Sequence, residues 1–305
     1  MDKIRLGTRG SPLALAQASE VKQRLEAAHG LGPNQIEIIA ISTTGDRIKD
    51  KPLAEIGGKG LFTKEIEEAL LTGAIDLAVH SMKDMPAQTP PGLMFPAVLP
   101  REDARDAFIS VKYAKFSELP QGAILGSSSV RRTAQALRLR PDLKSVGFRG
   151  NVETRLRKLN EGIADATFLA CAGLNRLGLA AHITEIMSED AMLPAVTQGI
   201  IVIETADSNQ AARDLVVAIN DPITMAAATC ERAFLAGLDG SCQTPIAGHA
   251  KVMGGTISFR GQALTLDGKH VFEHAMSGSL TDATAMGREA AEQVKQRGGN
   301  KLLHT

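Results

Sequence analysis

The sequence predicts an α/β protein of three domains: two similar α/β domains with a cleft between them, then a small C-terminal α+β domain with a three-stranded sheet and helices. Three observations lead to this prediction. The same order of strand, polar loop and helix occurs twice, over 4–86 and again over 123–173. Prolines are dense within 86–106, which marks a crossover between the two blocks. Beyond residue 219 the pattern changes to alternating strands.

The first block contains short apolar runs rich in β-branched residues and two segments with apolar residues at helical spacing. Pro12 stands near the start of one helix, where proline is tolerated, and Gly73 follows the other, where glycine commonly ends a helix. The segments 42–47 and 57–60 are expected to be flexible loops. The expected elements are strands at 4–6, 36–41 and 75–79, and helices at 13–27 and 63–71.

The second block follows the same plan. Its loop 126–132, rich in hydroxyls and arginine, corresponds to 7–12 of the first block, and Gly162-Ile-Ala-Asp165 corresponds to Gly73-Ala-Ile-Asp76. Asn151 is a favourable N-cap for the second helix. The expected elements are strands at 123–125, 145–148 and 164–170, and helices at 133–139 and 152–161. This correspondence predicts a duplication; the alternative is a chance likeness between two α/β segments.

A second crossover is expected at 192–202, and Ile200–Ile203 then forms a strand that returns to the first domain. Asp267-Gly268 is a strong hairpin signal in the last block. The elements expected there are a helix at 222–238, strands at 248–253, 256–264 and 270–274, and a helix at 282–296. The predicted domains are 1–98 with 199–218, then 99–198, then 219–305.

The composition argues against several classes of function. The 34 Lys and Arg balance 34 Asp and Glu, so net charge draws the chain neither to nucleic acid nor to an anionic membrane. Nine Phe, one Tyr and no Trp leave few rings for stacking on bases. Neither a membrane-length apolar run nor a CxxC or HExxH metal motif is present, and Gly57-Gly-Lys-Gly60 lacks the spacing of a phosphate loop. Three scattered cysteines and an N-terminus without an apolar signal core favour a reducing cytoplasm.

Asp84 is the first candidate for a reacting group. The apolar run 75–79 turns abruptly polar at His80, and Pro86 prevents a smooth helical continuation. In α/β proteins the loops at the carboxyl ends of strands line the ligand crevice. The alternative is that Lys83 and Asp84 form an ordinary solvated ion pair.

A set of cationic side chains lies in or beside polar loops at strand ends and helix starts. Arginine gives bidentate recognition of carboxylate or phosphate, and helix N-termini add free N–H donors. Several such groups facing one cleft predict a polyanionic ligand, whereas each one alone is explained by a surface ion pair. The set is Arg9, Lys59, Lys83, Arg131, Arg132, Arg149 and Arg155.

Cys242 differs from the other two cysteines because it lies between small residues in a loop, Gly240-Ser-Cys-Gln-Thr-Pro245. It is a candidate nucleophile or covalent attachment point, and the alternative is an inert thiol. Cys171 ends an apolar strand and Cys230 lies in an alanine-rich helix, so both are expected to be core residues.

Long motifs occur in order along nearly the whole chain. They are Gly7-Thr-Arg-Gly-Ser-Pro-Leu-Ala-Leu-Ala-Gln17, Gly57-Gly-Lys-Gly-Leu-Phe-Thr-Lys-Glu65, Val79-His-Ser-Met-Lys-Asp-Met-Pro86, Gly126-Ser-Ser-Ser-Val-Arg-Arg132, Arg149-Gly-Asn-Val-Glu-Thr-Arg155, Leu193-Pro-Ala-Val196, Glu231-Arg-Ala-Phe-Leu235 and Gly240-Ser-Cys-Gln-Thr-Pro-Ile246. In these motifs the chain strongly resembles the porphobilinogen deaminase (hydroxymethylbilane synthase) family.

The resemblance implies two lobes like those of periplasmic binding proteins and a third domain with the cofactor loop. It implies a transferase of tetrapyrrole, and hence porphyrin and heme, biosynthesis, cytoplasmic and monomeric. A dipyrromethane cofactor is bound by thioether at Cys242. Four porphobilinogen molecules condense on it head to tail, each losing ammonia, and hydrolysis releases hydroxymethylbilane.

The resemblance also implies roles for single residues. Asp84 is catalytic, and it stabilises positive charge on pyrrole nitrogens or moves protons. Lys59 and Phe62 sit on a loop that covers the cleft, and no metal is involved. The cofactor-binding residues are Cys242, Lys83, Ser129, Arg131 and Arg132. The substrate-binding residues are Arg9, Ser11, Arg149, Arg155 and Arg176.

The chain departs from the family at one segment. Thr197-Gln-Gly-Ile-Ile-Val-Ile-Glu204 stands where the family usually has Gly-Gln-Gly-Ala-hydrophobic-Gly-Ile-Glu, so Thr197, Ile200 and Val202 replace small residues. Glycine allows backbone angles that Thr and Val do not, so packing or hinge motion is expected to change here. The alternative function is a non-catalytic carboxylate-binding protein on the same two-lobed scaffold, which would need neither Cys242 nor Asp84.

Overall fold

The computed structural model describes residues 3–47, 60–239 and 244–302. Within them the chain forms two compact units, which are described one at a time. The first unit takes its described residues from 3–47, 60–102 and 199–225, and the second takes them from 103–198 and 226–302. The predicted cleft and the predicted domain boundaries stay predictions.

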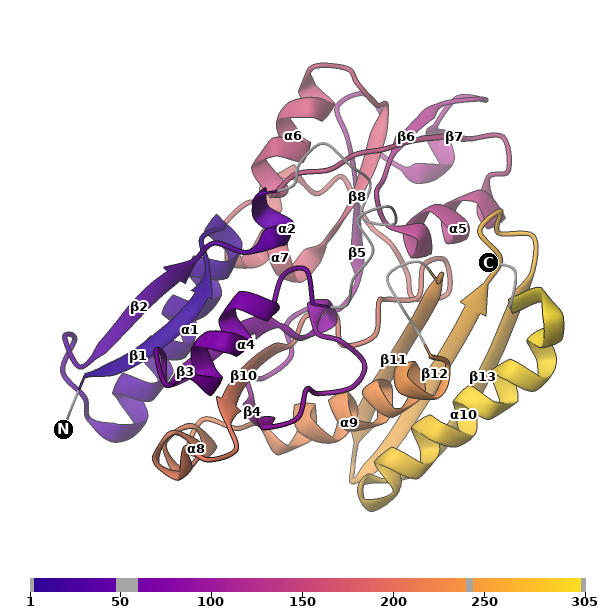
Figure 1. Cartoon of the computed structure of the whole chain (residues 1–305). Helices are drawn as coiled ribbons and strands as arrows, with labels where there is room; N and C mark the ends of the chain where they lie inside the picture. Colours follow the sequence, from indigo (N-terminus) through magenta and orange to yellow (C-terminus); the bar gives the residue numbers. More distant parts are fainter. Residues whose placement is uncertain (1–2, 48–59, 240–243, 303–305) are drawn as a thin grey trace. The chain divides into compact units, whose positions relative to one another are not determined.

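The first unit is built on a mixed five-stranded sheet in the order β2-β1-β3-β10-β4 (Figure 1). Its strands are β1 (Ile4–Arg9), β2 (Ile36–Ile41), β3 (Leu77–Ser81), β4 (Leu93–Val98) and β10 (Ile201–Ala206). The first three run parallel, whereas β10 is antiparallel to both β3 and β4. The predicted return of the strand near 200–203 to the first sheet is confirmed.

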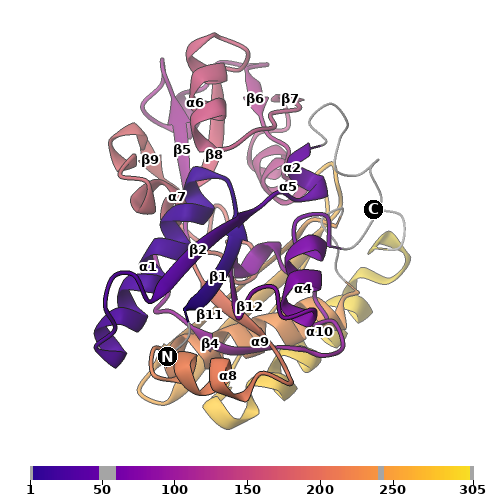
Figure 2. The same ribbon diagram turned by 60° about the vertical axis from the view of Figure 1, so that its left-hand side comes forward.

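Helices cover both faces of this sheet, as Figure 2 shows for α1 and α4 on either side of β1 and β2. On β3, Leu77 and Val79 pack in one core cluster with α1 and α8, and Ala78 packs in another with α4. This alternation is the period of two that a strand buried on both faces requires. The helices are α1 (Pro12–His29), α2 (Thr44–Arg47), α4 (Lys64–Leu71) and α8 (Gln210–Val217), with a 3-10 turn, η1, at Met82–Asp84.

The second unit contains a sheet of the same plan, in the order β7-β6-β8-β5-β9. Here β6 runs parallel to β7 and β8, and β5 is antiparallel to β8 and β9. In both sheets the first three strands of this order run parallel and the fourth runs antiparallel to its two neighbours, which confirms the prediction of two similar domains. The strands are β5 (Asp106–Ser110), β6 (Ile124–Gly126), β7 (Lys144–Val146), β8 (Ala166–Ala170) and β9 (Glu185–Ile186).

The helix predicted at 133–139 begins earlier. Ser129 caps α5 by accepting a hydrogen bond from the Arg132 amide, and the helix starts at Val130. Arg131 and Arg132 are therefore helical and buried, not part of an open loop as predicted. Asn151 caps α6 as predicted, through the Thr154 amide at 2.9 Å. The helices are α5 (Val130–Leu139), α6 (Val152–Asn160) and α7 (Cys171–Arg176), with 3-10 turns η2 (Phe116–Glu118) and η3 (Ala180–His182).

The C-terminal part of the second unit is an antiparallel sheet in the order β11-β12-β13. Two helices cover one face of it, because Phe234 of α9 and Val294 of α10 share a core cluster with Phe259 of the central strand (Figure 1). This is the predicted α+β arrangement. The elements are α9 (Pro222–Gly237), β11 (Ile246–Met253), β12 (Thr256–Leu264), β13 (Val271–Ser279), η4 (Leu280–Asp282), α10 (Ala283–Gly298) and η5 (Gly299–Leu302).

No helix among the described residues is long and apolar enough to cross a membrane. Cys171 and Cys230 are both buried, and burial raises the pKa of each thiol to about 12. Both are therefore inert core residues, as predicted.

Candidate active site

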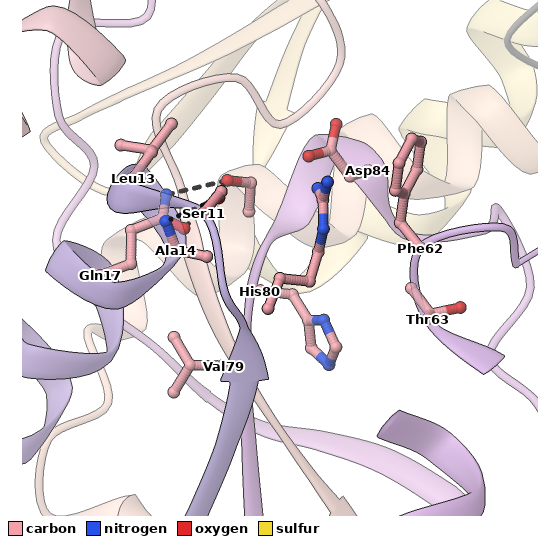
Figure 3. Close-up of a pocket in the computed structure, with 11 residues that line it drawn as sticks. Ser11, Leu13, Ala14, Gln17, Phe62, Thr63, Val79, His80 and Asp84 are labelled. Atoms are coloured by element: carbon pink, nitrogen blue, oxygen red, sulfur yellow. Dashed lines mark hydrogen bonds between the residues drawn. The ribbon is translucent and has the colours of Figure 1, made fainter. Parts of the chain in front are cut away.

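A pocket opens in the first unit at the carboxyl ends of its parallel strands. It is formed by the end of β1, the first turns of α1, the start of α4 and the segment from β3 into η1 (Figure 3). The lining residues are Arg9, Ser11, Leu13, Ala14, Gln17, Phe62, Thr63, Val79, His80, Ser81 and Asp84. Arg9, Ser11, Phe62 and Asp84 were all predicted site residues, so the fold brings four of them into one pocket.

Asp84 ends η1, directly after β3. The strand extends to Ser81, beyond the predicted end at residue 79, because β10 pairs with it as far as the Ile201–Ser81 register. The Asp84 side chain is exposed, and no described residue forms a hydrogen bond or an ion pair with its carboxylate. An exposed carboxylate without a partner is available to a ligand, which argues against the alternative of a pair with Lys83.

Arg9 is held at two places. Its Nε lies 3.3 Å from Oδ2 of Asp46, and its Nη2 donates to Oδ1 of the same carboxylate. Its guanidinium carbon lies 4.2 Å from the centre of the Phe62 ring, which is cation–π geometry. Burial alone would raise the pKa of Asp46, but hydrogen bonds from Arg9 and Thr43 together bring that pKa below its ordinary value.

Four polar residues of the pocket were not predicted as site residues: Gln17, Thr63, His80 and Ser81. Gln17, only 4% exposed, donates from Nε2 to the Ser81 hydroxyl at 2.8 Å. The Ser81 hydroxyl lies 3.1 Å from Oε1 of Gln17. Figure 3 shows the Gln17 amide directed toward the Ser11 side of the pocket. The only sequence signal was a glutamine on the apolar face of a helix, which local pattern does not separate from a surface residue.

His80 lines the pocket and belongs to a buried polar cluster. Its Nε2 is 3.1 Å from Oε2 of Glu204, which is fully buried on β10. Burial raises the pKa of Glu67 on α4, and the neighbouring Glu204 carboxylate raises it further. Within the described residues Oε1 of Glu204 and Oε1 of Glu67 are buried without a partner. His80 is thus an internal residue that anchors β3 to β10.

In the second unit Arg131 and Arg132 converge on Asp106. Oδ2 of Asp106 accepts from Nη1 of Arg131 at 2.7 Å, and Oδ1 accepts from Nε and Nη2 of Arg132 at 3.0 and 2.7 Å. Nη1 of Arg132 also donates to the Phe168 carbonyl. Arg132 therefore already donates most of its hydrogen bonds to Asp106 and the Phe168 carbonyl. Nε of Arg131 is buried and has no partner among the described residues.

The remaining predicted residues are scattered over the described chain. Arg149 follows β7, Arg155 lies on α6 with its Nε 2.9 Å from the Gly150 carbonyl, and Arg176 ends α7. All three are partly exposed. Lys83 lies on η1 beside Asp84. The predicted Lys59 and Cys242 lie outside the described residues.

Comparison with known proteins gives the same family along the chain. Residues 4–214 match the family model "Porphobilinogen deaminase, dipyromethane cofactor binding domain", and residues 225–296 match "Porphobilinogen deaminase, C-terminal domain". The chain belongs to the porphobilinogen deaminase family. The predicted transferase with a dipyrromethane cofactor domain is confirmed at this level.

Individual relatives of the porphobilinogen deaminase family cover almost the whole chain. The porphobilinogen deaminase of Paracoccus denitrificans is 55% identical over 96% of this chain and 94% of its own. That of Nitrobacter winogradskyi is 54% identical over 98% of this chain and 94% of its own. A crystal structure of protein PG110 from Staphylococcus aureus is 14% identical, covering 95% of this chain and all of that one, with a TM-score of 0.43. A periplasmic substrate-binding protein from Coxiella burnetii, 16% identical over 73% of this chain and 94% of its own, also has a TM-score of 0.43; both scores are too low to add to the argument.

The described residues fit a dipyrromethane, which carries several carboxylates. The buried Nε of Arg131 lacks a partner in the described part of the chain, and a ligand carboxylate would satisfy it. The hydroxyls of Ser127 to Ser129 and the N-terminus of α5 lie in the same stretch. Among the described residues no group of His, Cys, Asp and Glu has the arrangement of a metal site.

Proposed function

We propose that the protein joins four porphobilinogen molecules head to tail on a dipyrromethane bound through Cys242 and releases hydroxymethylbilane. One observation carries this proposal: the unpaired Asp84 carboxylate lies in the same pocket as Arg9 and Ser11. Such a pocket combines a group that stabilises positive charge with groups that bind a carboxylate. The protein is further proposed to be a cytoplasmic monomer.

Asp84 acts on the pyrrole ring of porphobilinogen. The amino group of the aminomethyl substituent leaves from its protonated form as ammonia, which takes both electrons of the C–N bond, and the ring with its methylene becomes a cation whose charge spreads to the pyrrole N–H. The Asp84 carboxylate accepts a hydrogen bond from that N–H and stabilises the charge. After the new carbon–carbon bond forms, the ring carbon loses its proton, and Asp84 is placed to accept it. The bound dipyrromethane supplies the pyrrole carbon to which the first substrate is joined.

The acetate and propionate of porphobilinogen require cationic and hydroxyl partners. Arg9 and Ser11 supply them inside the pocket. The partly exposed Arg149, Arg155 and Arg176 are assigned to further substrate carboxylates. Lys83, Ser129, Arg131 and Arg132 are assigned to the cofactor, and Phe62 with Lys59 is assigned to a covering loop. Each added ring brings two more carboxylates, which explains why one chain needs so many of these groups.

Two measurements test the proposal. Intact-protein mass spectrometry of enzyme from a porphobilinogen-making host should show two pyrrole rings on the Cys242 peptide, and a bare thiol would falsify the cofactor assignment. Asp84→Asn should retain that mass and lose turnover by about 100-fold or more. Asp214→Asn on α8, which removes an exposed carboxylate of the same unit outside the pocket, is the control. Near-normal turnover of Asp84→Asn would remove Asp84 from the mechanism.

A further inference from the structure

Residues 42–47, which directly follow β2, are more ordered than the sequence indicates. Residues 42–47 were expected to be a flexible loop, but α2 forms there and Thr43 is completely buried. The Thr43 hydroxyl donates to Oδ2 of Asp46 at 2.8 Å, which fixes that carboxylate within its own turn. The amide and hydroxyl of Thr44 both donate to Oε1 of Glu65 at 2.8 and 2.6 Å, which anchors the turn to α4.

Asp46 uses one edge of the Arg9 guanidinium, the edge formed by Nε and Nη2. A guanidinium is planar and offers two edges that each match a carboxylate. The second edge includes Nη1, for which the described residues supply no partner, and Arg9 itself lines the pocket with Asp84 and Ser11. Asp46 therefore holds one edge of the Arg9 guanidinium, and the other edge is still able to bind a second carboxylate.

Phe62 packs against a flat face of the Arg9 guanidinium and further restricts its position. The ring reaches this place because residue 45 is glycine. A Cβ on Gly45 would come within 2.3 Å of the Phe62 ring. Three neighbouring residues therefore fix the position of Arg9. Thr43 holds the Asp46 carboxylate, Asp46 binds the guanidinium, and Gly45 leaves room for the Phe62 ring.

We propose that Asp46 is a positioning residue that holds Arg9 by one edge so that its other edge receives a carboxylate of porphobilinogen. This inference rests on the proposed role of Arg9 in substrate binding. A rival arrangement, in which Asp46 is an internal competitor that the substrate must displace, predicts the opposite effect on affinity. Two of the five N–H groups of Arg9 serve Asp46 and three remain, so displacement is not required.

The test is steady-state kinetics of Asp46→Asn in the cofactor-loaded enzyme. Asparagine keeps the shape of the side chain and removes the charge, so KM for porphobilinogen should rise about 5-fold to 10-fold while kcat stays within about 2-fold. A fall in KM would establish the competitor instead. An unchanged KM would also overturn the proposal.

Asp76→Asn is a matched control. Asp76 grips Arg5 by the same edge, from Nε at 3.0 Å and Nη2 at 2.7 Å, on the same sheet but outside the pocket. It should lower Tm without changing KM. If both variants lower Tm and neither changes KM, Asp46 has a structural role only and the proposal fails.

A second readout separates this proposal from the activity itself. The Nε–H signal of Arg9 in nitrogen–proton NMR, assigned with Arg9→Lys, should be protected from solvent exchange in the wild type and lost in Asp46→Asn. Porphobilinogen should shift this signal in the wild type. A wild type that makes no hydroxymethylbilane would refute the proposed function, whereas an Arg9 signal equally protected in both proteins would refute the role of Asp46.

Discussion

Asp106→Asn tests the buried ion pairs that Asp106 forms with Arg131 and Arg132 of α5. The Asp106 carboxylate is fully buried and accepts from Arg131, from Arg132 and from Nε2 of Gln198 at 3.0 Å. Arg131 and Arg132 are themselves only 4% and 6% exposed. Asparagine would keep the shape and leave two buried guanidinium groups without a counter-charge. Breaking a buried ion pair in this way costs about 3–5 kcal/mol.

The assay is thermal and urea unfolding at pH 7. A loss of this size corresponds to a fall in Tm of about 10 °C for a unit of this length. Asp142→Asn, which removes a solvent-accessible partner of Arg140, is the control and should shift Tm far less. A loss below about 1 kcal/mol for Asp106→Asn would refute the reasoning, because it would mean that water or another group neutralises the two arginines.

The ion pairs of Asp106 with Arg131 and Arg132 also make the stability of the folded state depend on pH. Burial raises the pKa of Asp106, but the charges of Arg131 and Arg132 outweigh it and hold that pKa well below its usual range. A depressed pKa in the folded state stabilises the protein above the unfolded pKa of about 3.9, and this contribution is lost as pH falls below it. The difference in stability between wild type and Asp106→Asn should therefore be largest near neutral pH and shrink below about pH 4.

Three further predictions concern stability. Thr197 adopts a left-handed φ of 60°, which is strained for a β-branched residue, so Thr197→Gly should raise the stability of the folded state by about 0.5–1 kcal/mol in urea unfolding; a loss would show that the Thr side chain outweighs the strain. Gly199→Ala should lower Tm by several degrees, because φ is 91° and the new Cβ would come within 2.4 Å of the Glu102 carbonyl oxygen; an unchanged Tm would mean that this backbone moves freely. Glu67→Gln should raise Tm at pH 7 but not at pH 4, since a raised pKa marks a charge that the fold disfavours and that is neutralised in acid; equal effects at both pH values would contradict this.

Periodicity in the sequence was enough to predict the duplicated sheets, because each strand and each cap is decided by neighbouring residues. Asn151, which caps α6 within its own turn, is an example. The errors arise from contacts between residues distant in the sequence. The local pattern predicted that Arg131 is a cation in a loop. Its buried ion pair with Asp106, which begins β5, depends on tertiary packing and could not be predicted from that pattern.

The pocket shows the same division. Asp84 and Arg9 could be recognised because their motifs place them at strand ends. The grip of Asp46 on Arg9 and the pairing of Gln17 with Ser81 depend on tertiary packing, and no local spacing encodes either. Polar residues that act on other side chains are therefore the part of the site that sequence reasoning misses.

The insertion of β10 between β3 and β4 has a consequence for biosynthesis of the chain. His80 and Glu204 pair across these strands although they are 124 positions apart in the sequence. When the ribosome has completed residues 1–100, β3 still lacks its antiparallel neighbour, and the strand that leads to Asp84 remains an open edge. The second sheet, which lies wholly within 106–186, can pair earlier. The first sheet is thus begun first and completed late, and the strand that leads to Asp84 gains its antiparallel neighbour only after residues 106–186 have been synthesised.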